Sequence, residues 1–514
     1  MSDLRIFSYL PNPRIWKSII AARLAGGGAM RIHVLAVLCP LLLVGCGQPA
    51  PTDTSPSPKT YSAAAFYETT TYRLPAGYAW SADGERLLIG ADSLGALNAY
   101  ALPVSGASAS VLTTSADNPH RPLSWFPGDD RLLFAADNQG DELDHVHVLA
   151  PDGETVDLTP GEGLKALFMG WSAANDAFHV ATNERDAAVF DLYRYAVEGY
   201  ERELLFENDA NWRLGAISPD GRYVALLREN SSADNDIYIL DRDAAAAPPT
   251  HLTPHAGNIS HAVHEFTPDS GALLYGSDEG SEFMAVWRWD AATGEKTPLI
   301  QADWDVVFAF HSRSGRYLVQ GVNEDARIAV RIKDTATGDW LALPGLPQGN
   351  PGQIRFSRDE SKVALLLSTD TSPNDIYLVD LAQGESRRLT HAPNPEIDEA
   401  DLAPSAVVRF PSFDGLEIPA ILYRPKGASA VQPVPALVWV HGGPGGQSRR
   451  GYSAMIQHLV NHGYAILAAN NRGSSGYGKT FFHMDDRRHG EVDLDDIVYG
   501  KRYLAGLDWV DGQR

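Results

Sequence analysis

The chain has 514 residues, 44% of them hydrophobic and 21% charged, so most of it is globular and long enough for two domains. Acidic residues number 65 against 42 lysines and arginines, and the formal charge of −23 argues against a nucleic-acid partner. Cys39 and Cys46 are the only cysteines and both lie near the N-terminus, which excludes a disulfide framework or a cysteine metal site in the folded part.

Residues 1–46 predict a signal segment. Residues 34–44 form an apolar run with the length of a signal-peptide core, too short to span a membrane. The run ends in Leu43-Val44-Gly45-Cys46, which resembles a bacterial lipoprotein box in which Cys46 becomes the lipidated first residue. Translation could instead start at Met30. The alternative to a lipoprotein signal is an ordinary secretory signal in which the cysteine is incidental. We expect a protein of the bacterial cell envelope, attached to the membrane by a lipid at Cys46 (outer membrane or periplasmic side) or secreted.

Residues 47–71 predict a linker, because their Pro, Ser and Thr content cannot supply a core. A repeat follows it. A turn of the form apolar-Ser/Thr-Pro-Asp-Gly, with variations, recurs seven times at steps of 45 to 49 residues, each time followed by an apolar strand. Its fourth positions are 83, 129, 174, 220, 269, 314 and 359. This spacing is typical of four-stranded propeller blades and predicts an all-β seven-bladed propeller over residues 72–400, with six or eight blades as alternatives.

Residues 405–514 predict the N-terminal part of an α/β-hydrolase domain. Residues 407–423 alternate around Asp414-Gly415, which indicates a hairpin. Two buried strands, residues 437–440 and 464–469, enclose a helix over residues 452–460. A strand, helix and strand with a right-handed crossover bring the loops after both strands to one edge of the sheet, where such sheets bind ligands.

Both of those loops are rich in glycine. The first is His441-Gly442-Gly443-Pro444-Gly445-Gly446 and the second is Arg472-Gly473-Ser474-Ser475-Gly476-Tyr477-Gly478. Glycines let backbone N–H groups approach a ligand oxygen closely, as an oxyanion site requires. Tight turns alone would also explain a single glycine pair, but two such loops after consecutive strands favour the oxyanion site.

The two loops resemble the HGGP and RGS-x-GYG loops of the prolyl oligopeptidase family of serine peptidases, particularly its acylaminoacyl-peptidase and dipeptidyl-peptidase-like branches. The resemblance implies that Tyr477 donates its hydroxyl to the tetrahedral oxyanion, with His441, Gly442 and Gly443 in the oxyanion and substrate loop. It also implies short peptides as substrates, admitted past a propeller that lies over the site. The segment 138–142 resembles one in the family's propellers. Its Asp141 and Glu142 are turn carboxylates, which are usually solvated, and contact with a substrate amino group is the alternative.

A helix over residues 491–504 follows, in which we interpret Asp495 and Asp496 as local structure. The sequence contains no Gly-x-Ser-x-Gly elbow. In the family the triad of Ser, acid and His begins there, so none of the triad is expected among the 514 residues, and no histidine before it is a catalytic base. We therefore expect a truncated chain that is inactive as given, with residues 437–440 as an uncovered apolar edge. Neither a metal nor an organic cofactor is expected. The alternatives are a propeller-bearing esterase and a non-catalytic envelope binding protein.

Overall fold

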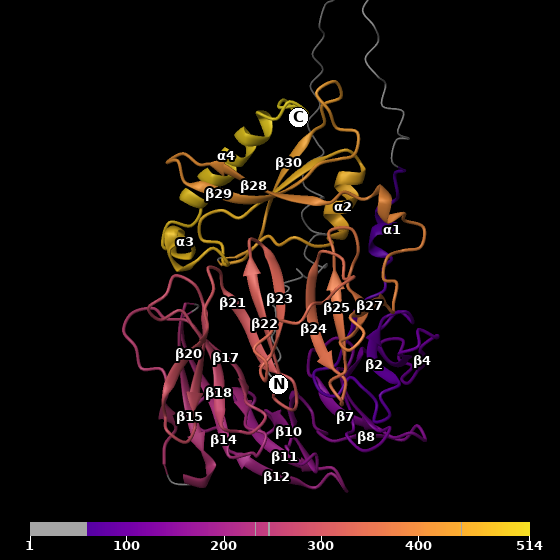
Figure 1. The fold of residues 1–514 in the computed structure, drawn as a ribbon, viewed down its shortest axis with the longest axis vertical. Helices are drawn as coiled ribbons and strands as arrows, with labels where there is room; N and C mark the ends of the chain where they lie inside the picture. The colour runs from indigo at the N-terminus through magenta and orange to yellow at the C-terminus, as the bar shows by residue number, and fades with distance from the viewer. Residues whose placement is uncertain (1–58, 232, 245–246, 444) are drawn as a thin grey trace, which may run out of the picture. The chain divides into compact units, whose positions relative to one another are not determined.

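Seven antiparallel sheets follow one another from Tyr72 to Arg388 in the computed structural model (Figure 1). The structure describes residues 59–514 apart from 232, 245–246 and 444, so the predicted signal segment and Cys46 lie outside the described residues. Six sheets have four strands, and the sixth along the chain has three. The predicted seven-bladed propeller is confirmed.

Each blade is a meander whose strands pair in the order of the sequence. The first three blades are β1 (Tyr72–Arg73), β2 (Arg86–Ala91), β3 (Asn98–Pro103), β4 (Ser110–Val111); β5 (His120–Trp125), β6 (Leu132–Ala136), β7 (His145–Leu149), β8 (Thr155–Asp157); and β9 (Ala166–Trp171), β10 (Ala177–Thr182), β11 (Asp191–Ala196), β12 (Arg202–Phe206). The others are β13 (Arg213–Ile217), β14 (Tyr223–Ser231), β15 (Asp234–Asp241), β16 (Thr250–His251); β17 (His261–Phe266), β18 (Ala272–Ser277), β19 (Ala285–Asp290), β20 (Lys296–Ile300); β21 (Val306–His311), β22 (Tyr317–Glu324), β23 (Arg327–Asp334); and β24 (Asn350–Phe356), β25 (Lys362–Ser368), β26 (Asp375–Asp380), β27 (Glu385–Arg388).

The repeated turn joins the first two strands of a blade and is closed by its own side chains. In the first blade the Ser81 hydroxyl donates to Asp83 at 2.5 Å, and the same hydroxyl accepts from the Arg86 N–H at 3.0 Å. The same pair of bonds recurs in three other blades, at Ser218, Thr267 and Ser357. Because these bonds are local, each turn sets the register of its hairpin independently of the other blades.

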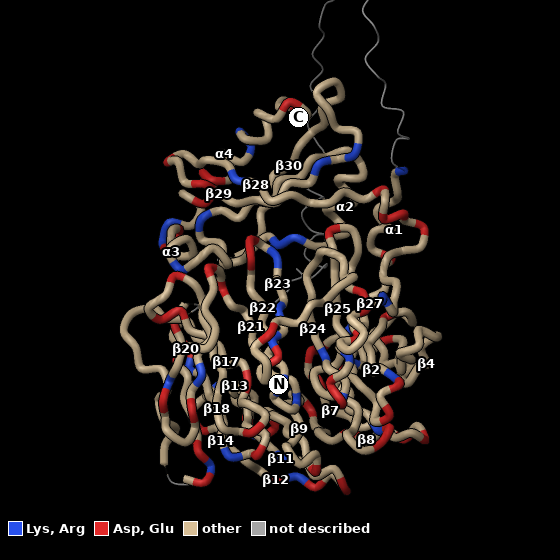
Figure 2. Tube along the Cα trace, in the orientation of Figure 1, with Lys and Arg blue, Asp and Glu red and all other residues tan. Residues whose placement is uncertain are grey.

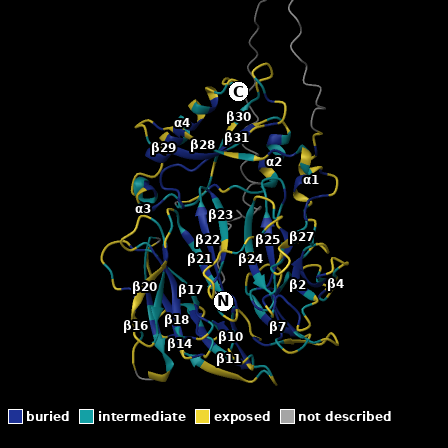
Figure 3. Ribbon diagram, viewed as in Figure 1, coloured by how far each residue is buried: buried dark blue, intermediate teal, exposed yellow. Residues whose placement is uncertain are grey.

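The ring is closed by side chains, since the first and last blades share no strand. The Leu74 N–H donates to Gln353 Oε1 at 2.8 Å, and Trp80 Nε1 donates to the Arg355 carbonyl at 3.1 Å. One apolar cluster contains buried residues of both blades. Figure 3 shows the second strands of the blades as largely buried. Acidic and basic residues are interspersed along the blades and the residues that follow them (Figure 2).

The residues after the propeller form an eighth sheet with the strand order β28-β29-β31-β30. Its elements are β28 (Ser405–Pro411), β29 (Glu417–Tyr423), β30 (Ala436–Val440), α2 (Ala454–Asn461), β31 (Ala465–Ala469), α3 (Lys479–Phe482) and α4 (Val492–Ala505). β28 and β29 are the predicted hairpin, and β30 and β31 are parallel. Helices α2 and α4 cover opposite faces, because alternate residues of β31 belong to the apolar clusters of α2 and of α4.

Strand β30 lies at the edge of this sheet, and Leu437 and Val440 are 40% and 52% exposed. The predicted edge at residues 437–440 is therefore exposed, and the final residues of the chain pair with the residues just before it. Val434 forms a parallel bridge with Val510, and the Ala436 N–H donates to the carbonyl of Arg514 at 3.3 Å. The last residues of the chain therefore run beside the edge up to Ala436.

Short helical segments complete the described part. α1 (Ala63–Tyr67), within the predicted linker, packs against α2, and the Tyr61 N–H donates to Asn461 Oδ1 at 3.0 Å. Single 3₁₀ turns are found at Arg242–Ala244, Glu399–Asp401 and His483–Asp485. Between residues 59 and 514, no described helix is long and apolar enough to cross a membrane.

Candidate functional site

The two glycine loops follow the parallel strands β30 and β31 and are bonded to each other. His441 Nε2 lies 2.8 Å from Ser474 Oγ, and the Ser475 N–H donates to the Gly446 carbonyl at 3.0 Å. Ser474 Oγ also lies 2.6 Å from the Asn471 carbonyl. The sequence predicted that both loops reach one edge of the sheet, and the structure brings them into direct contact.

His441 holds the loops together and is poorly suited to be a base. Its ring is half-buried, and this burial lowers the pKa of the imidazole, so that it is neutral at pH 7. Its Nδ1 lies 2.9 Å from the Gly442 carbonyl and its Nε2 lies 2.8 Å from Ser474 Oγ, so both ring nitrogens are engaged within the two loops. The side chain therefore fixes the path of the backbone that enters Gly442.

Gly442 and Gly443 are the exposed part of the first loop. A Cβ added to Gly442 would meet no atom within 4 Å. Within the described residues, no acceptor takes the backbone N–H of either glycine. Two neighbouring N–H groups beside open space can donate to an oxygen of a ligand.

Tyr477, in the second loop, has a protonated hydroxyl that can donate a hydrogen bond. Burial raises the pKa of its phenol to about 12, so the hydroxyl is protonated at neutral pH. Asn470 Nδ2 donates to this hydroxyl at 2.9 Å. The oxygen and nitrogen of the Asn470 amide cannot be exchanged without breaking two hydrogen bonds, because Oδ1 accepts from the Ser448 N–H and Nδ2 donates to the Ser448 carbonyl. The Tyr477 oxygen is thus an acceptor in this bond, and its proton stays available.

The second loop is anchored to the sheet by a buried arginine. Arg472 donates from its guanidinium and its backbone N–H to Asp496, which is 0% exposed, and from its other guanidinium nitrogen to Asp414. Ser412 Oγ donates to the same Asp496 carboxylate. Sequence reasoning missed this link, since residues 472 and 496 lie on different elements and nothing in their spacing marks a pair.

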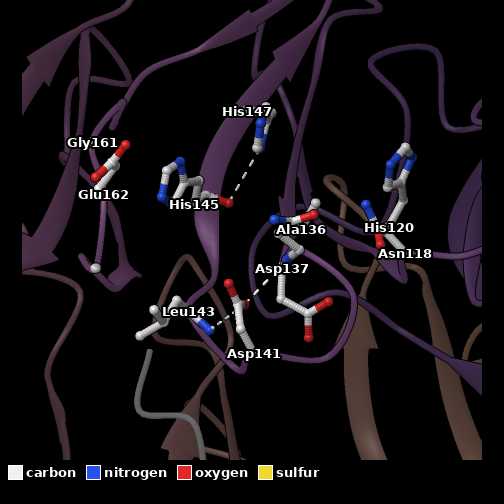
Figure 4. Close-up of a pocket in the computed structure, with 12 residues that line it drawn as sticks. Asn118, His120, Ala136, Asp137, Asp141, Leu143, His145, His147, Gly161 and Glu162 are labelled. Atoms are coloured by element: carbon white, nitrogen blue, oxygen red, sulfur yellow. Dashed lines mark hydrogen bonds between the residues drawn. The ribbon is translucent and has the colours of Figure 1, made fainter.

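The second blade carries a cavity of about 430 Å³ (Figure 4). Carboxyl groups of Asp137, Asp141 and Glu162 line it together with His120, His145 and His147. Backbone N–H groups lower the pKa of Asp141, and burial lowers the pKa of His120 and of His147, so Asp141 is a carboxylate and these two rings are neutral at pH 7. Asp137 is 6% exposed, and its Oδ1 is buried without a partner in the described part of the chain. Asp137 Oδ2 forms an ion pair with Arg121 at 3.1 Å, so the carboxyl groups of Asp141 and Glu162 are the ones that favour a cationic ligand. Glu142, the neighbour of Asp141, does not line the cavity.

Among the described residues, Asp485, His489 and Asp493 form the group whose ligand atoms lie close enough to share a metal ion. His489 Nδ1 lies 2.8 Å from Asp493 and 3.4 Å from Asp485, and its side chain is 64% exposed. This geometry is that of an exposed histidine paired with two carboxylates, and we assign it no further role.

A seven-bladed propeller followed by an α/β-hydrolase sheet with two joined glycine loops defines a propeller-bearing hydrolase. Residues 123–392, more than half of the chain, match the family described as the prolyl oligopeptidase N-terminal β-propeller domain, and residues 450–514 match the prolyl oligopeptidase family. The chain belongs to the prolyl oligopeptidase family.

Two relatives that match most of the chain carry the names of peptidases. Dipeptidyl aminopeptidase BIII of Pseudoxanthomonas mexicana is 27% identical over 430 residues, which are 81% of this chain and 62% of that protein. Dipeptidyl peptidase family member 6 of Caenorhabditis elegans is 22% identical over 440 residues, 76% of this chain and 57% of that protein. The chain thus spans less than two thirds of the length of these relatives. A puromycin-hydrolyzing peptidase of Mycobacterium tuberculosis has the same fold, with a TM-score of 0.69 at 17% identity over 89% of this chain and 75% of that one.

Proposed function

We propose that the chain forms the propeller and the oxyanion side of a serine peptidase that cleaves short peptides, with dipeptidyl-peptidase-like action. One observation carries the proposal: Gly442 and Gly443 are exposed, no acceptor among the described residues takes their backbone N–H groups, and their loop is fixed by contact with the Tyr477 loop. The names of the relatives support the substrate class. The reaction is acyl transfer through a serine ester that water resolves.

In this reaction the residues of the chain act on the carbonyl oxygen of the scissile bond. The oxygen becomes negative as a nucleophile attacks, and the Gly442 and Gly443 amides, together with the Tyr477 hydroxyl, donate to it. Donors that are already fixed in place stabilise the transition state more than the ground state, which lowers the barrier. His441 and Arg472 hold the two loops and exchange no proton with the substrate.

The cavity on the second blade supports a preference for peptides with a free amino end. The Asp141 carboxylate and the neutral rings of His120 and His147 suit an ammonium group. It borders the loop between β6 and β7. The equivalent loops of the fifth and sixth blades contact the residues after the propeller, through Asp278 to Lys479 and through Asp325 to Arg409. Placed on that side, the cavity would receive the amino end of a peptide whose scissile bond lies at the glycine loops.

We also propose that the protein is held at the bacterial cell envelope by a lipid on Cys46. The support is the sequence Leu43-Val44-Gly45-Cys46 after an apolar run. Metabolic labelling with a radioactive or alkyne fatty acid tests it.

The catalytic proposal is tested with dipeptidyl and N-acetyl-aminoacyl p-nitroanilides. The 514 residues contain no Gly-x-Ser-x-Gly sequence, so the assay uses a chain extended to carry such an elbow together with the acid and the histidine that follow it in the family, with the 514-residue chain as control. This extended chain is called the elbow-bearing chain. We expect hydrolysis of the dipeptidyl substrate, blocked by a fluorophosphonate, and little hydrolysis of the acetylated one. Absence of hydrolysis, or hydrolysis that the fluorophosphonate leaves untouched, would overturn the proposal.

A further inference from the structure

Helix α3 begins directly after the Tyr477 loop and has no cap from its own chain segment. Its N-cap residue is Gly478, which has no side chain. The N–H groups of its first turn donate instead to one residue of the propeller: Lys479 N–H to the Glu282 carbonyl at 2.8 Å and Thr480 N–H to Glu282 Oε1 at 2.7 Å. A residue nearly 200 positions earlier therefore supplies the cap that helix ends require.

The contact extends to the side chains on both sides. Glu282 Oε2 accepts from Thr480 Oγ1 at 2.8 Å, so each carboxylate oxygen has its own donor. Lys479 Nζ donates to the Asp278 carbonyl at 2.8 Å and lies 3.4 Å from the Asp278 carboxylate. Asp278 and Glu282 both belong to the loop between β18 and β19, beside which α3 lies in Figure 1.

The glycines of the second loop make this approach possible. A Cβ on Gly478, at φ +93°, would lie 2.5 Å from Glu282 Oε1. A Cβ on Gly476, at φ +86°, would lie 2.4 Å from both Asn323 Nδ2 and Gln447 Nε2. The missing side chains of Gly478 and Gly476 leave room for Glu282 of the fifth blade, for Asn323 of the sixth blade and for Gln447. Gly442 in the first loop borders open space instead.

Two neighbours complete the contact around the tyrosine. The Trp304 ring lies edge-on to the Tyr477 ring at 5.9 Å, and the next residue, Asp305, accepts from the Met284 N–H at 2.9 Å. The loop that carries Tyr477 is thus bounded by the propeller on one side and by the Arg472 anchor on the other.

We propose that Glu282 is a positioning residue for the candidate site: by capping α3 from the propeller, it holds the Tyr477 loop in the geometry in which its hydroxyl reaches the substrate. The propeller then helps to assemble the site and does more than limit access to it. The catalytic part of this inference rests on the proposed function, whereas the capping part does not.

Hydrogen exchange followed by mass spectrometry on the 514-residue chain tests the capping. In Glu282→Ala, amides of residues 476–482 should exchange roughly 2- to 30-fold faster, the effect expected for loss of a helix cap. Glu282→Gln keeps an acceptor oxygen and should give a smaller change, and Thr480→Val, which loses only the hydroxyl, should lie between it and wild type. Glu279→Ala is the matched control, because Glu279 is an exposed carboxylate on the same loop. Equal exchange in Glu282→Ala and Glu279→Ala would overturn the proposal.

Kinetics on the elbow-bearing chain tests the positioning. Glu282→Ala should lower kcat at least tenfold with KM changed less than threefold, and Glu282→Gln should restore most of the loss. If exchange accelerates while kcat stays constant, the positioning role is refuted. If the wild-type chain hydrolyses nothing, the proposed function fails, while the exchange data still decide the capping.

Discussion

The Arg472–Asp496 pair offers the clearest test of what holds the second glycine loop. Asp496 accepts from the Arg472 N–H at 2.9 Å, from Nε at 3.0 Å and from Nη2 at 2.9 Å, and it accepts from Ser412 Oγ as well. Asp496→Ala removes all of these acceptors at once. The Arg472 guanidinium then stays in the interior with a single carboxylate partner.

The magnitude follows from burial. The Arg472 side chain is 7% exposed and that of Asp496 is 0% exposed, so neither charge is well screened by water. Removing one partner of such a pair typically costs about 3–5 kcal/mol. Asp414 still faces Arg472, but its side chain is 41% exposed, which limits its compensation, and we expect the lower end, about 3 kcal/mol.

Hydrogen exchange of β31 measures this loss, with β18 of the fifth blade as an internal reference. A loss of about 3 kcal/mol predicts that amides of β31 exchange roughly 100-fold faster than in the wild type, and that the exchange rates of β18 do not change. Asp495→Ala is the control, because Asp495 is exposed on the same helix and its loss should change stability by less than about 0.5 kcal/mol. If Asp496→Ala accelerates β31 no more than the control does, the anchor does not hold the loop.

Three other changes are expected. On the elbow-bearing chain, Tyr477→Phe should lower kcat roughly 10²- to 10³-fold with little change in melting temperature, as for loss of one oxyanion donor; an unchanged kcat removes Tyr477 from that role. Burial, with the charges of Asp278 and Glu282, raises the pKa of Asp305, so the charged form of this carboxyl group destabilises the folded state. Asp305→Asn should therefore raise the melting temperature at pH 7. The gain in melting temperature should shrink as the pH falls and vanish below the ordinary carboxyl pKa of 3.8. A gain that is constant with pH would contradict this. Cys46→Ser should abolish fatty-acid labelling and release the protein from the membrane fraction; labelling that persists refutes the anchor.

The propeller could be predicted because its information is local. In four of the seven blades a hydroxyl and a carboxylate two residues later close the repeated turn, as at Ser81 and Asp83, and the other three blades keep its position, so the period is visible in the sequence. The strands β30 and β31 of the eighth sheet were equally visible, since both are short apolar runs that lead into glycine-rich loops.

Contacts between distant residues could not be predicted. The interpretation of every glycine as room for a ligand fits Gly442 but not Gly476 and Gly478, whose missing side chains make room for Asn323, Gln447 and Glu282. Nothing in the sequence near residue 282 marks it as a cap for a helix at residue 479. The same holds for the pairing of the final residues with the segment that leads into β30, through the bridge between Val434 and Val510.

The central claim is that the first glycine loop holds a negatively charged oxygen, and Gly442→Ala tests it most directly. The added methyl group would meet no protein atom within 4 Å, so the fold and the melting temperature should be unchanged. On the elbow-bearing chain, kcat/KM for a dipeptidyl p-nitroanilide should fall by about 10²-fold, because the methyl group blocks the approach of the oxygen to the backbone amides. Wild-type kcat/KM in a Gly442→Ala enzyme that melts normally would contradict the account.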